Sequence, residues 1–244
     1  MLSKNQIKLI SSLKQKKYRQ QHGLFVVEGI KTVNELLHSN LQLHQLYTTT
    51  LQFDVLDDLV TQITEAELKK ISFLKAPNMV LAVFKFPEPK PVDFSRLVVA
   101  LDDVRDPGNL GTIIRLCDWF GVNDLICSNE TVDCYNPKVI QATMGSITRV
   151  NVSYVDLEDI LKNQDVIKFG AFMNGENVYE TNLPTSGILV LGNEANGISK
   201  EIESLTIKRI SIPRFGDLQE TESLNVANAT AILLSEFKRR STGK

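Results

Sequence analysis

Cysteine is scarce in this chain, and the cysteines present form no recognisable metal or disulfide pattern. Only three occur in 244 residues, at Cys117, Cys127 and Cys134. Their number is odd, none forms a CxxC pair, and no histidine lies near them at metal-ligand spacing. We therefore expect reduced, partly buried thiols and no bound metal.

Long apolar runs are also missing. The first residues lead into polar sequence without the apolar core of a secretory signal, and no run approaches the length that crosses a bilayer. No GxGxxG pattern follows the first strand, and no loop combines several glycines with a lysine as a P-loop does. These absences predict a cytoplasmic protein with no membrane partner, and they argue against a nicotinamide enzyme.

Acidic residues are absent before Glu28, although the formal net charge of the whole chain is −2. The basic residues in this stretch that we select as candidate RNA contacts are Lys14, Lys16, Lys17 and Arg19. A locally basic region on a nearly neutral protein fits a polyanion-binding surface. It also fits the solvated face of a short helix, and charge alone slightly favours this second interpretation.

The hydrophobic pattern predicts two domains of the α/β class. In the first, strands are expected over 23–28, 43–47 and 79–86, and helices over 32–38, 54–60 and 65–72, after a basic helix. Three prolines between 87 and 91 favour an extended linker. The predicted division is an N-terminal domain over 1–86, a linker over 87–96 and a C-terminal domain over 97–244.

The C-terminal domain is predicted to contain a mainly parallel sheet, because its apolar strands alternate with helical stretches. The expected strands span 97–101, 124–127, 150–155, 167–173, 188–191 and 207–212. Ligands collect at the carboxyl ends of strands in such sheets. The loops that follow three of these strands are therefore the candidate site.

The first of these segments, 101–115, runs from a strand through a Pro-Gly turn into a helix that we expect to end near Gly121. Arg115 lies near the helix start, where the helix dipole disfavours a positive charge unless an anion binds it. A phosphate or carboxylate partner would explain this placement. An exposed Arg115 and an Asn109 that merely caps the helix are the alternative.

The second segment, 188–199, is a strand that ends in a glycine-bearing turn. Gly192 allows the backbone to approach a ligand closely, and Gly197 allows a positive φ. Glu194 is either a polar pocket residue or a turn carboxylate.

The third segment joins a strand ending at Pro213 to an alanine-rich helix. We expect Ser223 to cap that helix.

Together, these segments resemble the three motifs of the SpoU/TrmH family of RNA 2′-O-ribose methyltransferases, within the SPOUT superfamily. The resemblance covers about residues 97–240 and lies in Asp106–Gly111 with Arg115, in Leu191–Gly197, and in Ile212-Pro213 followed by Ser223–Asn225. The N-terminal part resembles the ribosomal-protein-L30-like RNA-binding domain of this family through Val26–Gly29.

The resemblance implies a trefoil knot in the C-terminal domain, S-adenosylmethionine as methyl donor, and a homodimer that forms through the knot region. It assigns catalysis to Arg115, Asn109, Glu194, Ser223 and Asn225. It assigns donor contacts to Gly192, Ile212 and Leu224, with Leu191, Asn193, Pro213, Gly216 and Leu218 beside them. A guanidinium is normally always protonated, so for Arg115 we favour orientation and charge stabilisation over proton abstraction.

One departure from the family pattern lies in the third segment, where residues 218–221 lengthen the loop before Ser223. Leu218 is therefore an alternative to Leu224 as the adenine contact. The separate basic domain resembles that of the ribosomal-RNA members more than the small transfer-RNA members, which favours 23S ribosomal RNA as substrate. Transfer RNA, methylation of a guanine base, and a non-catalytic RNA-binding factor with the same fold remain the alternatives.

Overall fold

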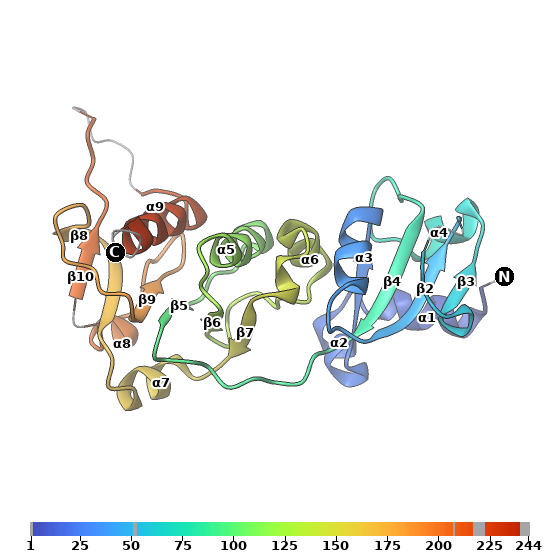
Figure 1. Cartoon of the computed structure of the whole chain (residues 1–244), viewed down its shortest axis with the longest axis horizontal. Coiled ribbons are helices and arrows are strands. Elements are labelled where there is room, and N and C mark those ends of the chain that lie inside the picture. The colour runs from blue at the N-terminus through green and yellow to red at the C-terminus, as the bar shows by residue number, and fades with distance from the viewer. Residues whose placement is uncertain (1, 51–52, 207, 217–222, 240–244) are drawn as a thin grey trace. The chain divides into compact units, whose positions relative to one another are not determined.

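The computed structural model describes residues 2–50, 53–206, 208–216 and 223–239. The chain forms two compact units (Figure 1). The first contains residues 1–89 and 133–148, and the second contains residues 90–132 and 149–244. Residues 133–148 therefore belong to the first unit, although in the sequence they lie between two strands of the second.

The first unit is built on a four-stranded sheet of order β1-β4-β2-β3, in which only β2 and β3 are parallel. Its elements are α1 (Lys4–Ser12), α2 (Lys16–His22), β1 (Leu24–Glu28), α3 (Ile30–Leu37), β2 (Leu43–Thr48), the 3-10 helix η1 (Asp57–Leu59), β3 (Val60–Gln62), α4 (Glu65–Ile71), β4 (Val80–Lys85), α6 (Pro137–Thr143) and the 3-10 helix η2 (Ser146–Thr148).

Two layers of helices cover this sheet. Side chains of successive strand residues point to opposite faces, so Leu24 and Val26 join the core formed with α1 and α4. On the other face, α3 and α6 contact β1. The prediction of a helix over 54–60 is wrong for most of that range, because only the single turn η1 forms. Val60 then enters β3, where pairing with β2 satisfies its backbone hydrogen bonds.

Residues 133–148 complete the core of the first unit. The Tyr135 ring stacks on Phe86 at 4.3 Å between centroids and lies 4.7 Å from Phe25. Arg19 is only 1% exposed, and it forms an ion pair with Asp133 while donating hydrogen bonds to the carbonyls of Leu13 and Lys14. Arg19 is thus an interior structural residue, and its selection as an RNA contact does not fit this position.

The second unit contains a six-stranded sheet of order β10-β8-β9-β5-β6-β7, in which every described pairing is parallel. The prediction of an α/β domain with a mainly parallel sheet is confirmed. Its elements are β5 (Leu97–Leu101), α5 (Pro107–Trp119), β6 (Asp124–Cys127), β7 (Asn151–Tyr154), α7 (Leu157–Asn163), β8 (Lys168–Asn177), β9 (Gly187–Leu191), α8 (Lys200–Glu203), β10 (Lys208–Ser211) and α9 (Val226–Arg239).

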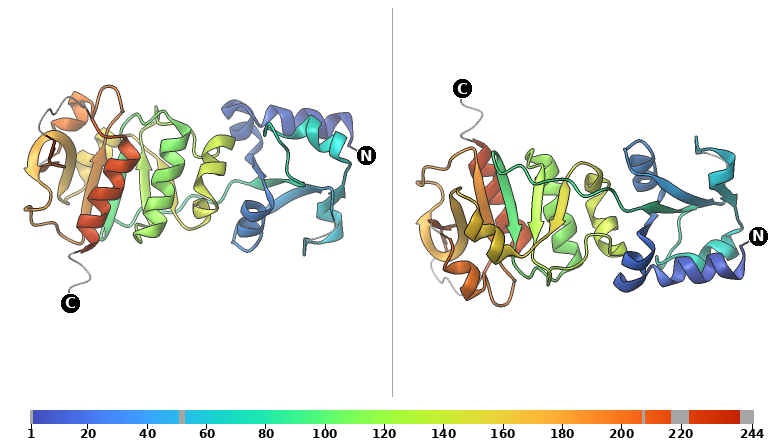
Figure 2. Two further views of the ribbon diagram at one scale, coloured as in Figure 1. Left: turned by 90° about the horizontal axis from the view of Figure 1, so that it is seen from above. Right: turned by 90° about the horizontal axis from the view of Figure 1, so that it is seen from below.

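Helices cover both faces of this sheet (Figures 1 and 2). α7 and α8 form an apolar core with one face, and α5 lies beside α9 on the other. Because the strands are parallel, the loops after β5, β9 and β10 leave the sheet at the same edge. Among the described residues, no helix is long and apolar enough to cross a membrane.

Candidate functional site

The loop after β5 fixes the backbone of Asn109, in the first turn of α5, and leaves the Asn109 side chain available for hydrogen bonds to other segments. Asp106 caps α5 by accepting a hydrogen bond from the backbone N–H of Asn109 at 2.8 Å, and Pro107 occupies the first turn, where it removes no helical hydrogen bond. Asn109 is therefore not the cap. The helix ends as expected before Gly121, which has a φ of +63°.

A chain of hydrogen bonds joins the three candidate segments. The Asn109 Nδ2 donates to Glu194 Oε1 at 2.6 Å, and the Asn109 Oδ1 accepts from Asn225 Nδ2 at 2.9 Å. Both bonds link residues more than 80 positions apart in the sequence. We call Glu194, Asn109 and Asn225 the polar chain. It fixes the orientation of the Asn109 amide and presents one carboxylate and two amides at the edge of the sheet.

Asn225 also fixes the start of α9. Its Oδ1 accepts hydrogen bonds from the backbone N–H groups of Ala227 and Asn228, at 3.0 and 3.3 Å. The prediction that Ser223 caps this helix is therefore wrong, because Asn225 stands next to the first helical residue. Ser223 is exposed, and no described residue forms a hydrogen bond with its side chain.

Asn193, Asp102 and Asp103 hold the loop after β9, and the sequence did not assign these roles to them. The Asn193 Nδ2 donates to the Asp103 carbonyl at 2.7 Å, while the Asn193 Oδ1 accepts from the backbone of the following turn. The buried Asp102 carboxylate accepts from the Ser199 N–H at 2.7 Å. Asp103 has a φ of +58°, which is uncommon for a non-glycine residue. Adjacent carboxylates directly after an apolar strand were the available sequence signal.

Gly192 stands where two backbone segments come closest together. A methyl group on its Cα would collide with backbone atoms of Gly197 and Ile198. The Asn193 and Gly197 backbones exchange hydrogen bonds of 3.0 and 2.8 Å across the same turn. The turn is thus narrow and built from backbone, a geometry that suits close contact with a nucleoside.

Other predicted donor contacts surround this edge. Leu191 is buried in β9, Ile212 and Pro213 are partly buried directly after β10, and Gly216 is exposed with open space at its Cα. Leu224 is 48% exposed and stands beside the polar chain residue Asn225. Leu218 lies outside the described residues.

Arg115 is exposed on α5, and no described residue forms a hydrogen bond or ion pair with it. Trp119, one turn further along the same helix, is 84% exposed. The structure therefore brings Asn109, Glu194 and Asn225 into contact, but it does not join Arg115 or Ser223 to them. A free guanidinium on this helix is available to an external anion.

Of the remaining residues considered in the sequence, the lysines are exposed and the cysteines are buried. Lys14, Lys16 and Lys17 are exposed on the first unit, so these three are accessible to a polyanion. Cys117, Cys127 and Cys134 are buried thiols, and burial raises the pKa of Cys117 to about 12. Among the described residues, no group of histidine, cysteine and acidic side chains is arranged to hold a metal ion.

Comparison with solved structures supports the same fold over the whole chain. A protein of the TrmH family from Porphyromonas gingivalis has 41% sequence identity and a TM-score of 0.89, with 98% of this chain and 99% of that chain covered. The AdoMet-bound rRNA methyltransferase from Sinorhizobium meliloti has 29% identity and a TM-score of 0.85, with 98% and 96% covered.

Sequence comparison gives the family. The 23S rRNA (guanosine(2553)-2′-O)-methyltransferase RlmP of Bacillus subtilis is 33% identical to this chain, with 97% of each protein covered. The model of the MRM3-like substrate binding domain matches residues 4–82. The model of the SpoU rRNA Methylase family matches residues 96–235, which include every residue of the polar chain. The chain therefore belongs to the SpoU rRNA methylase family.

Proposed function

We propose that this protein transfers a methyl group from S-adenosylmethionine to a ribose 2′-hydroxyl of structured RNA, with 23S ribosomal RNA as the substrate. The polar chain is the observation that carries this proposal. It gathers a carboxylate and two amides from three distant segments at the edge where ligands bind in parallel sheets. The Bacillus subtilis relative acts on 23S ribosomal RNA, which favours that substrate over transfer RNA.

The residues present fit the methyl donor. The narrow turn at Gly192 has no room for a side chain, and the exposed Leu224 offers an apolar surface for an adenine ring. When bound, S-adenosylmethionine supplies a methyl group attached to a positively charged sulfur. Gly192, Leu191 and Ile212 would contact it through backbone groups, with Asn193 fixing the turn through the Asp103 carbonyl.

The catalytic work of the chain is to place and polarise the ribose. Arg115 carries a permanent positive charge and no partner among the described residues, so it binds a substrate phosphate and stabilises the negative charge that develops on the 2′-oxygen. The Asn109 amide is held in one orientation by Glu194 and Asn225. A fixed amide positions a hydroxyl without reorganising during the reaction.

We also propose that the C-terminal segment is threaded as a trefoil knot and that two copies pair through this region. β10 lies at one end of the sheet order, whereas α9, which follows it, packs beside α5, so the chain returns across the neighbouring strands. Trp119 on α5 is 84% exposed, so the helix that packs beside α9 offers apolar surface to a second copy. Sedimentation should give twice the chain mass of 27.4 kDa.

The test is methyl transfer to RNA isolated from cells that lack this gene. Labelled methyl groups should appear in alkali-resistant dinucleotides, because a methylated 2′-oxygen cannot take part in alkaline cleavage. Label confined to the bases would contradict the proposal. Transfer to purified transfer RNA but not to ribosomal RNA would contradict the substrate assignment alone.

Arg115→Ala tests the catalytic assignment. We expect methyl transfer to fall by at least two orders of magnitude, while donor affinity stays within about twofold, since Arg115 acts on the RNA. Arg96→Ala is the matched control, because Arg96 is an exposed arginine at the opposite, amino end of β5. Equal turnover of the two variants would refute the role of Arg115.

A further inference from the structure

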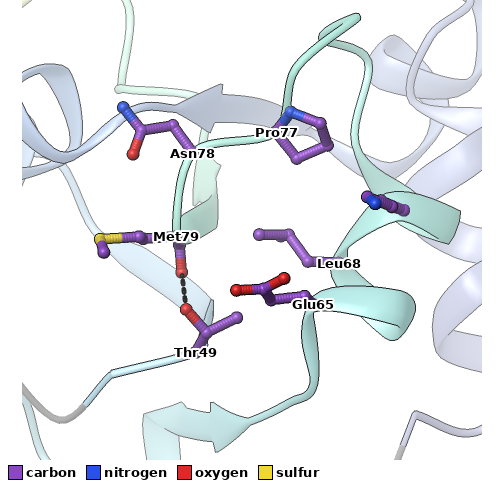
Figure 3. Close-up of a pocket in the computed structure, with 7 residues that line it drawn as sticks. Thr49, Glu65, Leu68, Pro77, Asn78 and Met79 are labelled. Carbon is purple, nitrogen blue, oxygen red and sulfur yellow. Dashed lines mark hydrogen bonds between the residues drawn. The ribbon is translucent and has the colours of Figure 1, made fainter.

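The first unit contains a cavity of about 160 Å³ where α4 faces the residues that precede β4. Leu68 and Pro77 form an apolar wall, and Thr49 lies on the other side (Figure 3). The Glu65 carboxylate points into the space between them (Figure 3). Glu65 forms no hydrogen bond or ion pair with any described residue. The cavity therefore combines an apolar surface with an acceptor that nothing in the described chain uses.

The backbone on one side of this cavity is held in an uncommon conformation. Met79 has a φ of +55°, and its carbonyl accepts hydrogen bonds from the Thr49 N–H at 2.9 Å and the Thr49 hydroxyl at 3.4 Å. Met79 also leaves 44% of its surface exposed. Non-glycine residues persist in this conformation only where the surrounding structure fixes them, and such positions cluster at ligand sites.

Exposed lysines lie in the segment that supplies most of the cavity lining, and Lys69 is itself part of that lining. Residues 68–79 include Lys69, Lys70 and Lys75, all exposed, and contain no aspartate or glutamate. Lys14 lies over the Phe73 ring, 6.0 Å from its centroid, which connects this segment to the exposed lysines after α1. Lysines beside a cavity suit the phosphates of a nucleic acid, whereas the Glu65 carboxylate inside it disfavours a bare phosphate.

We propose that this cavity binds an unpaired guanine base of the substrate RNA while Lys69, Lys70 and Lys75 contact the adjoining phosphates. Unpaired bases are the parts of RNA that proteins recognise through hydrogen bonds to their Watson–Crick edge. Guanine presents two neighbouring N–H donors on that edge, which match the two oxygens of the Glu65 carboxylate. Pro77 contacts the face of the base. This inference rests on the proposed function for the identity of the ligand as RNA.

The test measures binding of labelled single-stranded RNA by fluorescence anisotropy, with the full chain and no methyl donor. The probes are an eleven-nucleotide adenosine oligomer with one central guanosine and the same oligomer with inosine, which lacks the amino group of guanine. We expect the guanosine probe to bind roughly tenfold more tightly, the effect of one hydrogen bond to a charged group. Equal affinities would overturn the proposal.

Glu65→Gln should remove this preference, because the side-chain amide offers only one acceptor. Asp58→Asn, a change of the same kind at an exposed position outside the cavity, should keep the preference. Replacing Lys69, Lys70 and Lys75 together by glutamine should weaken binding of both probes and reduce its dependence on salt. A preference for guanosine that survives in Glu65→Gln would overturn the assignment.

This result can be distinguished from failure of the proposed function. The binding assay needs no methyl transfer, so a guanosine preference without any transfer activity would overturn only the enzymatic proposal. Methyl transfer by wild type with no guanosine preference would overturn only the cavity. Unchanged thermal unfolding of Glu65→Gln, measured by circular dichroism, establishes that the variant is folded.

Discussion

Removing the Asp133 carboxylate should destabilise the first unit severely. In the folded protein the Asp133 Oδ2 accepts hydrogen bonds from two nitrogens of Arg19, of which the Nε bond is 2.8 Å long, and the Asp133 Oδ1 accepts from the Tyr135 N–H at 3.1 Å. The two side chains are 2% and 11% exposed. Asp133→Ala therefore leaves a buried guanidinium with two unsatisfied donors and no counter-charge.

The size of the effect follows from this geometry. Breaking a buried ion pair by removing one partner costs about 3–5 kcal/mol. That is a large part of the roughly 5–15 kcal/mol that stabilises a typical domain. The two remaining bonds of Arg19, to the Leu13 and Lys14 carbonyls at 2.9 Å, hold the guanidinium in place and prevent it from reaching water.

Urea unfolding followed by circular dichroism measures this change as a shift of the transition midpoint. Asp133→Asn retains an oxygen for the Tyr135 N–H and so isolates the loss of charge. The double variant Arg19→Met/Asp133→Leu should be more stable than Asp133→Ala, because it removes both charges together. Asp133→Ala with wild-type stability, or a double variant less stable than Asp133→Ala, would refute the reasoning.

Two further predictions concern substitutions of single residues. Gly192→Ala should abolish donor binding in equilibrium dialysis while the chain stays folded, because the added methyl forces the turn apart at Gly197 and Ile198; unchanged affinity would contradict the narrow-turn assignment. Burial raises the pKa of Glu28 above its usual 4.5, despite hydrogen bonds from Ser72 and Phe73 that oppose the rise. The protonated form is therefore favoured in the fold, and the stabilisation is lost as pH rises through the raised pKa. Glu28→Gln should consequently gain stability relative to wild type as pH rises above 4.5 in urea titrations, and a difference that does not vary with pH would exclude this cause.

The sheet of the second unit was largely predictable because its strands are uninterrupted apolar runs. Strands buried on both faces have this pattern, and β5 and β9 are buried throughout. Short elements were harder to predict. β3 has three residues, too few for a period to emerge, and α2 was not separated from the basic helix before it.

The location of the site was predictable from the sequence, but its hydrogen bonds were less so. Strand ends and glycines marked the loops, but the prediction that Ser223 caps α9 was wrong, and the alternative in which Asn109 merely caps α5 does not hold either. Asp106 rather than Asn109 caps α5, and Asn225 rather than Ser223 caps α9. Several polar residues precede each helix, and which one accepts the N–H bonds depends on where the first helical residue falls. The hydrogen bonds from Asn109 to Glu194 and Asn225 join segments that are far apart in the sequence, so no local sequence pattern predicts them.

The position of residues 133–148 limits how this protein can be recombined with its relatives. The family model for the catalytic part spans residues 96–235 without interruption, yet this stretch contains part of the core of the other unit. A chimera that takes residues 1–89 from a homologue would pair a foreign Phe25 and Arg19 with the host's Tyr135 and Asp133. The substrate-binding unit is therefore not a freely exchangeable module, and substitutions in its core must be matched by changes in a segment about a hundred residues away.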